Sequence, residues 1–273
     1  WEFQQEDLVE CLLKPVGGVA GWSMALGKSR LATGMVLLSG VRHGLLAMAA
    51  YLVPEFAGKL AALPIDADEW QAIDSPAQLT TLKRINLISY ERLRMKLPGR
   101  KTQTYAHKLR RRIGLLVADE GELLANPLSE QSVALARVAA KRKFCLTGTP
   151  CPNYPRDLLP IIAFTGGDGT AAQPFGFRGP YMEPRLVTSA ACARRGVDQF
   201  RENFVTLEWV TDAFLEDMRG GAKREVPKIN NLPAYRAALA PHIKRRIPQE
   251  PLVAKDVQIP VPNRQEPHVL SFD

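Results

Sequence analysis

The chain contains little of what marks zinc-binding, disulfide-stabilised or membrane-spanning proteins. It has 4 Cys and 4 His among 273 residues, and no CxxC motif or His pair at the spacing of metal ligands. These absences exclude a zinc site and a disulfide framework, and they indicate a reducing compartment. The most apolar long stretch, residues 31–56, is interrupted by Arg42, His43 and Glu55. It falls short of the roughly 18–20 apolar residues of a membrane span, so we expect no membrane partner.

Acidic residues are also in deficit, because 36 Lys and Arg face 28 Asp and Glu and give a formal net charge of +8. Such a surplus favours a polyanionic partner, most often nucleic acid. Residues 96–112 hold several cations and no acid. They form either a surface that tracks phosphates or a solvated helix face. The candidate DNA contacts in this segment are Arg100, Lys101, Lys108, Arg110, Arg111 and Arg112.

The first two thirds of the chain alternate short apolar runs with helical spacing, which is typical of βαβ units and a parallel sheet. Strands are predicted at residues 19–21, 44–50, 85–90, 113–118 and 143–147. Helices are predicted over residues 28–38, 53–63, 76–84, 129–142, 199–218 and 233–246, with a Gly-rich loop at 165–179 and an extended Pro-rich stretch at 248–267. We therefore predict an α/β fold with a central, mainly parallel sheet flanked by helices, plus a helical extension.

The predicted domain organisation follows these changes in pattern. Residues 1–163 form the core, residues 164–250 form a loop insertion and helical extension, and residues 251–273 form an extended connector. The chain begins at Trp1 rather than Met and ends soon after a Pro-rich stretch. We expect both ends to be cuts through a longer protein.

The first motif with chemical content lies between a predicted strand and a predicted helix. A phosphate-binding turn needs backbone N–H groups that face phosphate, a Lys for the β- and γ-phosphates and a hydroxyl for Mg²⁺. Gly27, Lys28 and Ser29 supply these parts, although Trp22 stands where the full G-x-x-x-x-G-K-[ST] pattern begins with Gly. A chance Gly-Lys-Ser at a helix start is an equally open interpretation. The candidate nucleotide-binding residues here are Met24, Ala25, Leu26, Gly27, Lys28, Ser29 and Arg30.

Two further motifs follow predicted strands. Asp119 and Glu120 end an apolar run, where an Asp would hold Mg²⁺ and a Glu would activate water. Thr147 and Thr149 flank Gly148 after the next run, and their hydroxyls could sense a γ-phosphate. An exposed acidic turn and a simple strand-to-loop turn are the plainer alternatives. Because ligands of parallel α/β sheets bind at the carboxyl ends of strands, we expect all three motifs at one sheet edge.

In this order, the three motifs resemble those of the Swi/Snf-type DNA translocases of helicase superfamily two. Residues 22–29, 119–122 and 146–153 resemble the first, second and third motifs of that family, and the third is the most specific. Residues 3–4, 87–91 and 242–246 add weaker likenesses. The resemblance spans residue 3 to about residue 250 and implies the family's first RecA-like lobe.

The resemblance implies a role for each motif residue. Lys28 would neutralise the β- and γ-phosphates of ATP, while Ser29 and Asp119 would hold Mg²⁺. Glu120 would activate the attacking water, and Gln4 would read the adenine edge. The implied cofactors are thus ATP and Mg²⁺, and the implied activity is DNA-dependent ATP hydrolysis.

The resemblance also implies how hydrolysis connects to partners. Thr147, Gly148 and Thr149 would couple nucleotide state to DNA contacts. The implied partners are double-stranded DNA, a second RecA-like lobe that supplies an arginine finger, and a larger nucleoprotein complex. We expect an intracellular location with DNA, with a bacterial or phage-infected cytoplasm favoured over a nucleus.

Several residues depart from the family pattern and keep other functions open. Trp22 and Ser23 replace an acidic pair, and Ala25 replaces a Gly at a position where a positive φ would be strained. Glu122 replaces a His that links the second motif to the third. A degenerate lobe that acts as a DNA-binding or assembly scaffold is therefore an alternative. A small-molecule P-loop kinase is another, against which residues 146–150 count.

Overall fold

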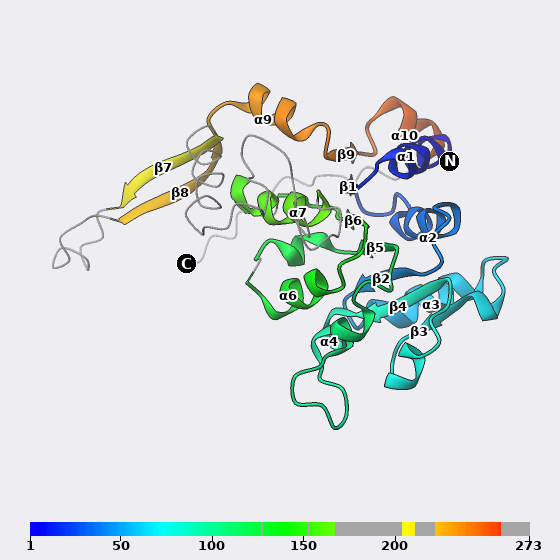
Figure 1. Cartoon of the computed structure of the whole chain (residues 1–273). Helices are drawn as coiled ribbons and strands as arrows, with labels where there is room; N and C mark the ends of the chain where they lie inside the picture. The colour runs from blue at the N-terminus through cyan, green and yellow to red at the C-terminus, as the bar shows by residue number, and fades with distance from the viewer. Residues whose placement is uncertain (127, 152, 167–203, 211–221, 258–273) are drawn as a thin grey trace, which may run out of the picture.

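A seven-stranded sheet forms the centre of the computed structural model, which describes residues 1–126, 128–151, 153–166, 204–210 and 222–257. The strand order is β3-β4-β2-β5-β6-β1-β9, and every neighbouring pair is parallel (Figure 1). The strands are β1 (Gly17–Trp22), β2 (Gly44–Met48), β3 (Trp70–Ala72), β4 (Ile85–Ser89), β5 (Leu115–Ala118), β6 (Arg142–Leu146) and β9 (Ile243–Arg246). The predicted α/β class with a parallel sheet is confirmed.

Helices cover both faces of the sheet. The α-helices are α1 (Glu2–Leu13), α2 (Lys28–Leu38), α3 (Leu52–Ala61), α4 (Tyr90–Arg94), α5 (Tyr105–Leu109), α6 (Glu130–Arg137), α7 (Leu158–Thr165), α9 (Leu232–Leu239) and α10 (Pro251–Asp256). The 3₁₀ helices are Ala67–Glu69, Pro76–Leu79, Gly121–Leu124 and Pro155–Asp157. One core joins α1, α2, α3 and α10 to the sheet, and the other joins α4, α5, α6 and α7 to it (Figure 1). No helix among the described residues is long and apolar enough to cross a membrane.

The two cores follow from the alternation of side chains along each strand. All residues of β2 are buried, with Leu45 and Ala47 in one core and Leu46 and Met48 in the other. Strand β5 is likewise buried throughout. Near-continuous apolar runs are what a parallel sheet covered on both faces requires.

Two predicted helices in the core region are shorter than their sequence patterns suggest. Residues 76–84 form only the 3₁₀ helix Pro76–Leu79, whose amino-terminal end is capped by a capping box between Ser75 and Gln78. Helix α6 ends at Arg137, and Ala139 then adopts a left-handed φ of 55°. A left-handed residue ends a helix and turns the chain, here toward β6.

The helical prediction over residues 199–218 is wrong where the structure describes this segment. Val205–Val210 is strand β7, paired antiparallel with β8 (Ala222–Ile229), and this hairpin projects to the left in Figure 1. β-branched and aromatic residues within this segment favour a strand, and they outweigh the helical spacing of Phe204 and Leu207. The Gly-rich loop at 165–179 lies almost wholly outside the described residues.

The end of the chain also differs from its prediction. The predicted helix over residues 233–246 is divided into α9 and the edge strand β9, which pairs with β1. Residues 251–256, expected to be extended, form α10, because Pro251 stands at a position of the first turn that needs no N–H donor. The division of the chain into three domains stays a prediction.

A buried ion pair fixes β9 to α1, which lies at the opposite end of the sequence. Arg246 donates to Asp7 of α1 over 2.6 Å, from Nη2 to Oδ1, and 3.0 Å, from Nε to Oδ2. Trp22 Nε1 at the end of β1 donates to the same carboxylate over 3.0 Å. Asp7 is only 1% exposed, and its hydrogen bonds raise the pKa of Arg246 above the ordinary value. One carboxylate thereby joins α1, β1 and β9.

We predict that Asp7→Ala lowers the free energy of unfolding by about 3 kcal/mol, because it leaves a buried guanidinium with only Glu6 and Glu250 as partners. Urea unfolding of the purified chain measures this change. Glu10→Ala is the matched control, because it removes only the partly exposed ion pairs to Lys244 and Lys14 and should lose no more than about 1 kcal/mol. Equal losses in the two variants would contradict the prediction.

Candidate nucleotide-binding site

The turn between β1 and α2 has the geometry of a phosphate cradle. Gly27 has a φ of 85°, a left-handed conformation that favours glycine, and a Cβ there would lie 2.3 Å from Gln4 Nε2, so the end of the Gln4 side chain would have to move. Gly27 is also the N-cap of α2 and offers no side chain to the first-turn N–H groups. No acidic residue stands in that turn. Open N–H groups at the positive end of a helix dipole are suited to bind phosphate.

Side chains predicted to bind nucleotide contact carbonyls of this turn. Lys28 Nζ donates to Trp22 O over 3.2 Å, and Gln4 Nε2 donates to Leu26 O over 2.8 Å. Ala25 has a φ of 65°, so the strain expected of an Ala at this position is present. The turn therefore holds its shape through contacts of the Lys and Gln that would face ATP.

The acidic pair, Asp119 and Glu120, follows the end of β5, which is the direct neighbour of β6 in the sheet. Asp119 N donates to Ala47 O over 2.8 Å, and Tyr90 OH donates to Asp119 O over 2.5 Å. Burial raises the pKa of the Asp119 carboxyl. A Cβ on Gly121 would lie 1.9 Å from Cys145 Sγ, so glycine is required where this turn passes β6.

Glu120 and Glu122 form a pair of neighbouring carboxylates. Burial, followed by the hydrogen bond to Glu122 and its negative charge, raises the pKa of Glu120 to about 7. Glu120 itself has a left-handed φ of 50°. A general base is most effective when its pKa lies near the working pH, so this carboxylate is suited to take a proton from water near neutrality.

The third motif contacts both of the others. Thr147, which is fully buried, donates from Oγ1 to Glu122 Oε2 over 2.5 Å and accepts from Thr149 N over 3.0 Å. A Cβ built on Gly148 would lie 3.6 Å from Lys28 Nζ. The structure thus brings Lys28, the acidic turn and the Thr-Gly-Thr turn together at the carboxyl edge of β1, β5 and β6.

The structure adds Arg245 and Trp1, which sequence reasoning did not place in the site. Arg245 of β9 donates from Nη1 to Gly21 O over 2.6 Å and to Gly148 O over 3.0 Å, so it connects the first and third motifs. Trp1 stacks on Phe3 at 5.8 Å between ring centroids, and the Arg30 guanidinium lies 5.9 Å from the Trp1 ring. The basic run at 244–246 was the only signal for Arg245, because its contacts depend on β9 being a strand.

The predicted DNA-binding residues do not gather at this edge. Arg111 and Arg112 precede β5 and so lie at its amino end, and Arg112 Nη1 donates to Leu79 O over 2.5 Å. Arg100, Lys108 and Arg112 surround a hollow of about 490 Å³. Lys101 and Arg110 are exposed. Their role in DNA binding stays a prediction.

The donor set at the carboxyl edge fits Mg²⁺ and ATP. Ser29 in the first turn of α2 offers a hydroxyl, and Asp119 offers a carboxylate; both are hard oxygen ligands of the kind Mg²⁺ prefers. The uncapped first turn of α2 and Lys28 Nζ supply donors and positive charge for phosphates. Ser29, Asp119 and Lys28 would therefore hold the metal and nucleotide.

A parallel sheet that carries a Gly-Lys-Ser turn after one strand, an acidic pair after a second and a Thr-Gly-Thr turn after a third defines a RecA-like P-loop NTPase lobe. Residues 54–184 match the sequence model of the SNF2-related domain. This match supports the likeness to the Swi/Snf-type ATPase lobes of helicase superfamily two that the motifs predicted. The matched segment includes the second and third motifs and begins after the first.

Similar proteins point to the same family. A segment of 109 residues of this chain is 28% identical to the DNA repair and recombination protein RAD54B of Mus musculus. The match covers 40% of this chain and 11% of RAD54B. The fold is similar to the Sulfolobus solfataricus SWI2/SNF2 ATPase core, solved alone and in complex with dsDNA. Each of these two structures is 16% identical in sequence to this chain, with a TM-score of 0.61 and coverage of 94% of this chain. The match covers 45% of the core solved alone and 46% of the core solved with dsDNA. The chain thus spans less than half of each of these structures.

We predict that Ala25→Gly stabilises the chain by up to about 1 kcal/mol, because glycine adopts a positive φ without the Cβ strain. Urea unfolding measures the change. Ala139 also has a positive φ but lies away from the nucleotide site, so Ala139→Gly should stabilise the chain to a similar degree. Ala57→Gly within α3 should instead destabilise it by about 1 kcal/mol. Destabilisation by Ala25→Gly equal to that by Ala57→Gly would contradict the prediction.

Proposed function

We propose that this chain is the ATP-binding and ATP-hydrolysing first lobe of a DNA-dependent ATPase that translocates on double-stranded DNA. The observation that carries the proposal is the contact of the three motifs at one sheet edge. Lys28 lies beside Gly148, and Thr147 is hydrogen-bonded to Glu122. A chance Gly-Lys-Ser or an isolated acidic turn would have no reason to meet in this way.

Each residue of this edge has a chemical task in the proposal. Bound Mg-ATP supplies the γ-phosphoryl group that water attacks. Lys28 would exchange its bond to Trp22 O for phosphate oxygens, and Ser29 and Asp119 would hold the metal. Glu120 accepts the proton of the attacking water, for which its pKa of about 7 is suited.

The bond between Thr147 and Glu122 provides a route for coupling. Thr147 Oγ1 donates to Glu122 and accepts from Thr149 N, so a change at the acidic turn reaches the Thr-Gly-Thr turn directly. In this chain a carboxylate occupies the position of the family's His. The hydroxyl of Thr147 therefore donates to the carboxylate of Glu122, and this hydrogen bond couples the acidic turn to the Thr-Gly-Thr turn.

Duplex DNA and a second RecA-like lobe complete the proposal. The net charge of +8 supports a polyanionic partner. RAD54B is a DNA repair and recombination protein, and the SWI2/SNF2 ATPase core was solved with dsDNA. A second lobe would supply an arginine finger, worth roughly 10³–10⁵ in rate, so this lobe alone should hydrolyse ATP slowly. An intracellular location with DNA and a larger nucleoprotein complex belong to the same proposal.

A scaffold lobe without hydrolysis is the second candidate function. The strained Ala25 and the carboxylate of Glu122 near the other acids favour it, since both could weaken nucleotide binding. Calorimetric titration with Mg-ATP separates the two functions. Binding that Lys28→Ala abolishes supports the motor, and no binding by the unaltered protein supports the scaffold.

We predict that Lys28→Ala abolishes Mg-ATP binding, because it removes the charge that neutralises the phosphates. Glu120→Gln should retain binding but lower the DNA-stimulated kcat of the full-length protein at least about 100-fold, because no carboxylate takes the proton. Lys228→Ala, an exposed cation on β8, is the control and should change neither. Unchanged hydrolysis in both site variants would remove Lys28 and Glu120 from the mechanism.

We predict that kcat rises with pH through an apparent pKa near 7, because Glu120 is protonated below that value and acts only as the carboxylate above it. Glu122→Gln removes a neighbouring negative charge, so the rising limb should move to lower pH. Steady-state ATP hydrolysis between about pH 5.5 and 8.5 measures this. The exposed Glu91→Gln is the control, and a limb that Glu122→Gln leaves in place would refute the assignment.

A further inference from the structure

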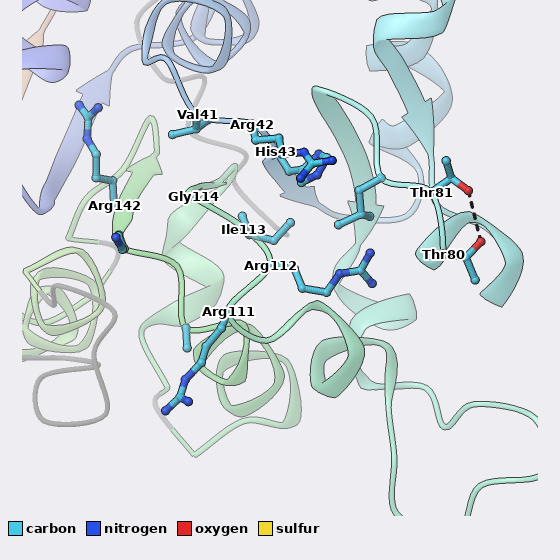
Figure 2. Close-up of a pocket in the computed structure, with 13 residues that line it drawn as sticks. Val41, Arg42, His43, Thr80, Thr81, Arg111, Arg112, Ile113, Gly114 and Arg142 are labelled. Atoms are coloured by element: carbon cyan, nitrogen blue, oxygen red, sulfur yellow. Dashed lines mark hydrogen bonds between the residues drawn. The ribbon is translucent and has the colours of Figure 1, made fainter.

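A second concave site lies at the opposite, amino-terminal edge of the sheet. Its lining comes from the loops that precede β4, β2, β5 and β6, which are consecutive neighbours in the sheet (Figure 2). The hollow has a volume of about 990 Å³. Crossing four strands at about 4.8 Å spacing gives a groove roughly 14 Å long. We call this hollow, lined by residues 41–43, 80–82, 111–114, 139, 141 and 142, the amino-edge groove.

The amino-edge groove is lined by cations and by no acidic residue. The side chains of Arg42, Arg111 and Lys141 make no hydrogen bond or ion pair with any residue that the structure describes. In Figure 2, Arg112 extends toward the side of the groove formed by Thr80 and Thr81, where its Nη1 donates to Leu79 O, whereas Arg111 and Arg142 extend away from the centre of the groove. Cations gathered without counter-charges repel one another, and a bound polyanion relieves that repulsion.

The groove is built on a constrained backbone. Arg111 has a φ of 60° and Ala139 a φ of 55°, and their loops are tied by Arg111 N donating to Val138 O over 3.0 Å. The other described non-glycine residues with positive φ are Ala25 and Glu120, which both belong to the nucleotide site. Left-handed backbone of this kind persists where the surrounding structure enforces it, and it concentrates at binding sites.

The chemistry of the lining selects the ligand. Thr80 and Thr81 add hydroxyls 3.3 Å apart, and Ile113 contributes an apolar wall. The adjoining hollow shares Thr80 and Arg112 and adds Arg100 and Lys108, so the cations continue past the groove. The groove contains no Phe, Tyr or Trp on which bases would stack. Successive positive side chains without a stacking platform match a row of phosphates rather than bases.

We propose that the amino-edge groove binds the phosphates of one nucleic-acid strand, at a site separate from the nucleotide edge. Contacts by Arg42, Lys141 and Arg112 would track the backbone without reading sequence, and the length of about 14 Å admits only a few nucleotides. The proposal is independent of ATP hydrolysis, because none of the lining residues belongs to the first, second or third motif.

The test measures binding of a labelled 12-nucleotide single strand to the full-length protein without Mg²⁺ or ATP. The Arg42→Ala/Lys141→Ala double variant should bind at least tenfold more weakly, and the slope of log K against log salt should fall by about 1.4 for two lost phosphate contacts. Both side chains are exposed, so folding should be retained, which circular dichroism verifies. Lys228→Ala is the matched control; affinity of the double variant within twofold of that control overturns the proposal.

A footprint and a competitor locate the ligand. The bound strand should protect the Lys141 amino group from acetylation and leave Lys228 reactive, and equal reactivity of Lys141 with and without strand overturns the proposal. Tripolyphosphate carries the same phosphate chemistry in free form. Competition that is weak per phosphate supports a strand, whereas displacement at equal phosphate concentration overturns the strand as the ligand in favour of a free polyphosphate. The kcat at saturating DNA should be unchanged in the double variant, which separates this result from any failure of the ATPase.

Discussion

The parallel pairing of β1, β6 and β5 is the constraint on which the site depends. Ala20 lies beside Leu146, and Cys145 lies beside Ala118, so β5 and β6 end within one residue of each other and β1 ends two residues further on. The residues that follow each strand must then meet above the sheet. No long loop is needed to bring Lys28, Glu122 and Thr147 together, and the hydrogen bond between the last two follows from adjacent strands. The alignment of the strands therefore decides which turns can interact, whatever residues those turns contain.

The departure at Trp22 concerns packing beneath the phosphate cradle. Trp22 is fully buried, its ring lies 5.3 Å from that of Phe3, and its Nε1 bonds to Asp7. The backbone carbonyl of Trp22 still accepts from Lys28. The indole therefore anchors β1 to α1, while the turn above it keeps the Gly, Lys and Ser that face phosphate. Glu122 differs in kind, because it changes the charge within the acidic turn itself.

Sequence periodicity predicted the central strands and α2 well, because their side chains are buried on a regular pattern. It failed where tertiary contacts decide the conformation. Ile243–Arg246 is mostly basic, so its sequence alone does not predict a strand. It forms β9 because it pairs with the edge of β1 and because Arg246 binds the carboxylate of Asp7. The motif residues were predicted, but the contacts of Arg245 and the bond between Thr147 and Glu122 depend on neighbours that no local pattern reveals.

The two edges of the sheet differ in charge, and the sheet itself separates them. The carboxyl edge has Asp119, Glu120 and Glu122 together with Lys28 and Arg245, whereas the charged residues that line the groove at the amino edge are all cations. A strand of five residues, such as β2, spans roughly 16 Å. This exceeds the Debye length of about 8 Å at physiological salt. Phosphates at one edge therefore neither repel nor attract phosphates at the other to any large degree, and one small lobe can hold two anionic ligands without a direct electrostatic conflict between them.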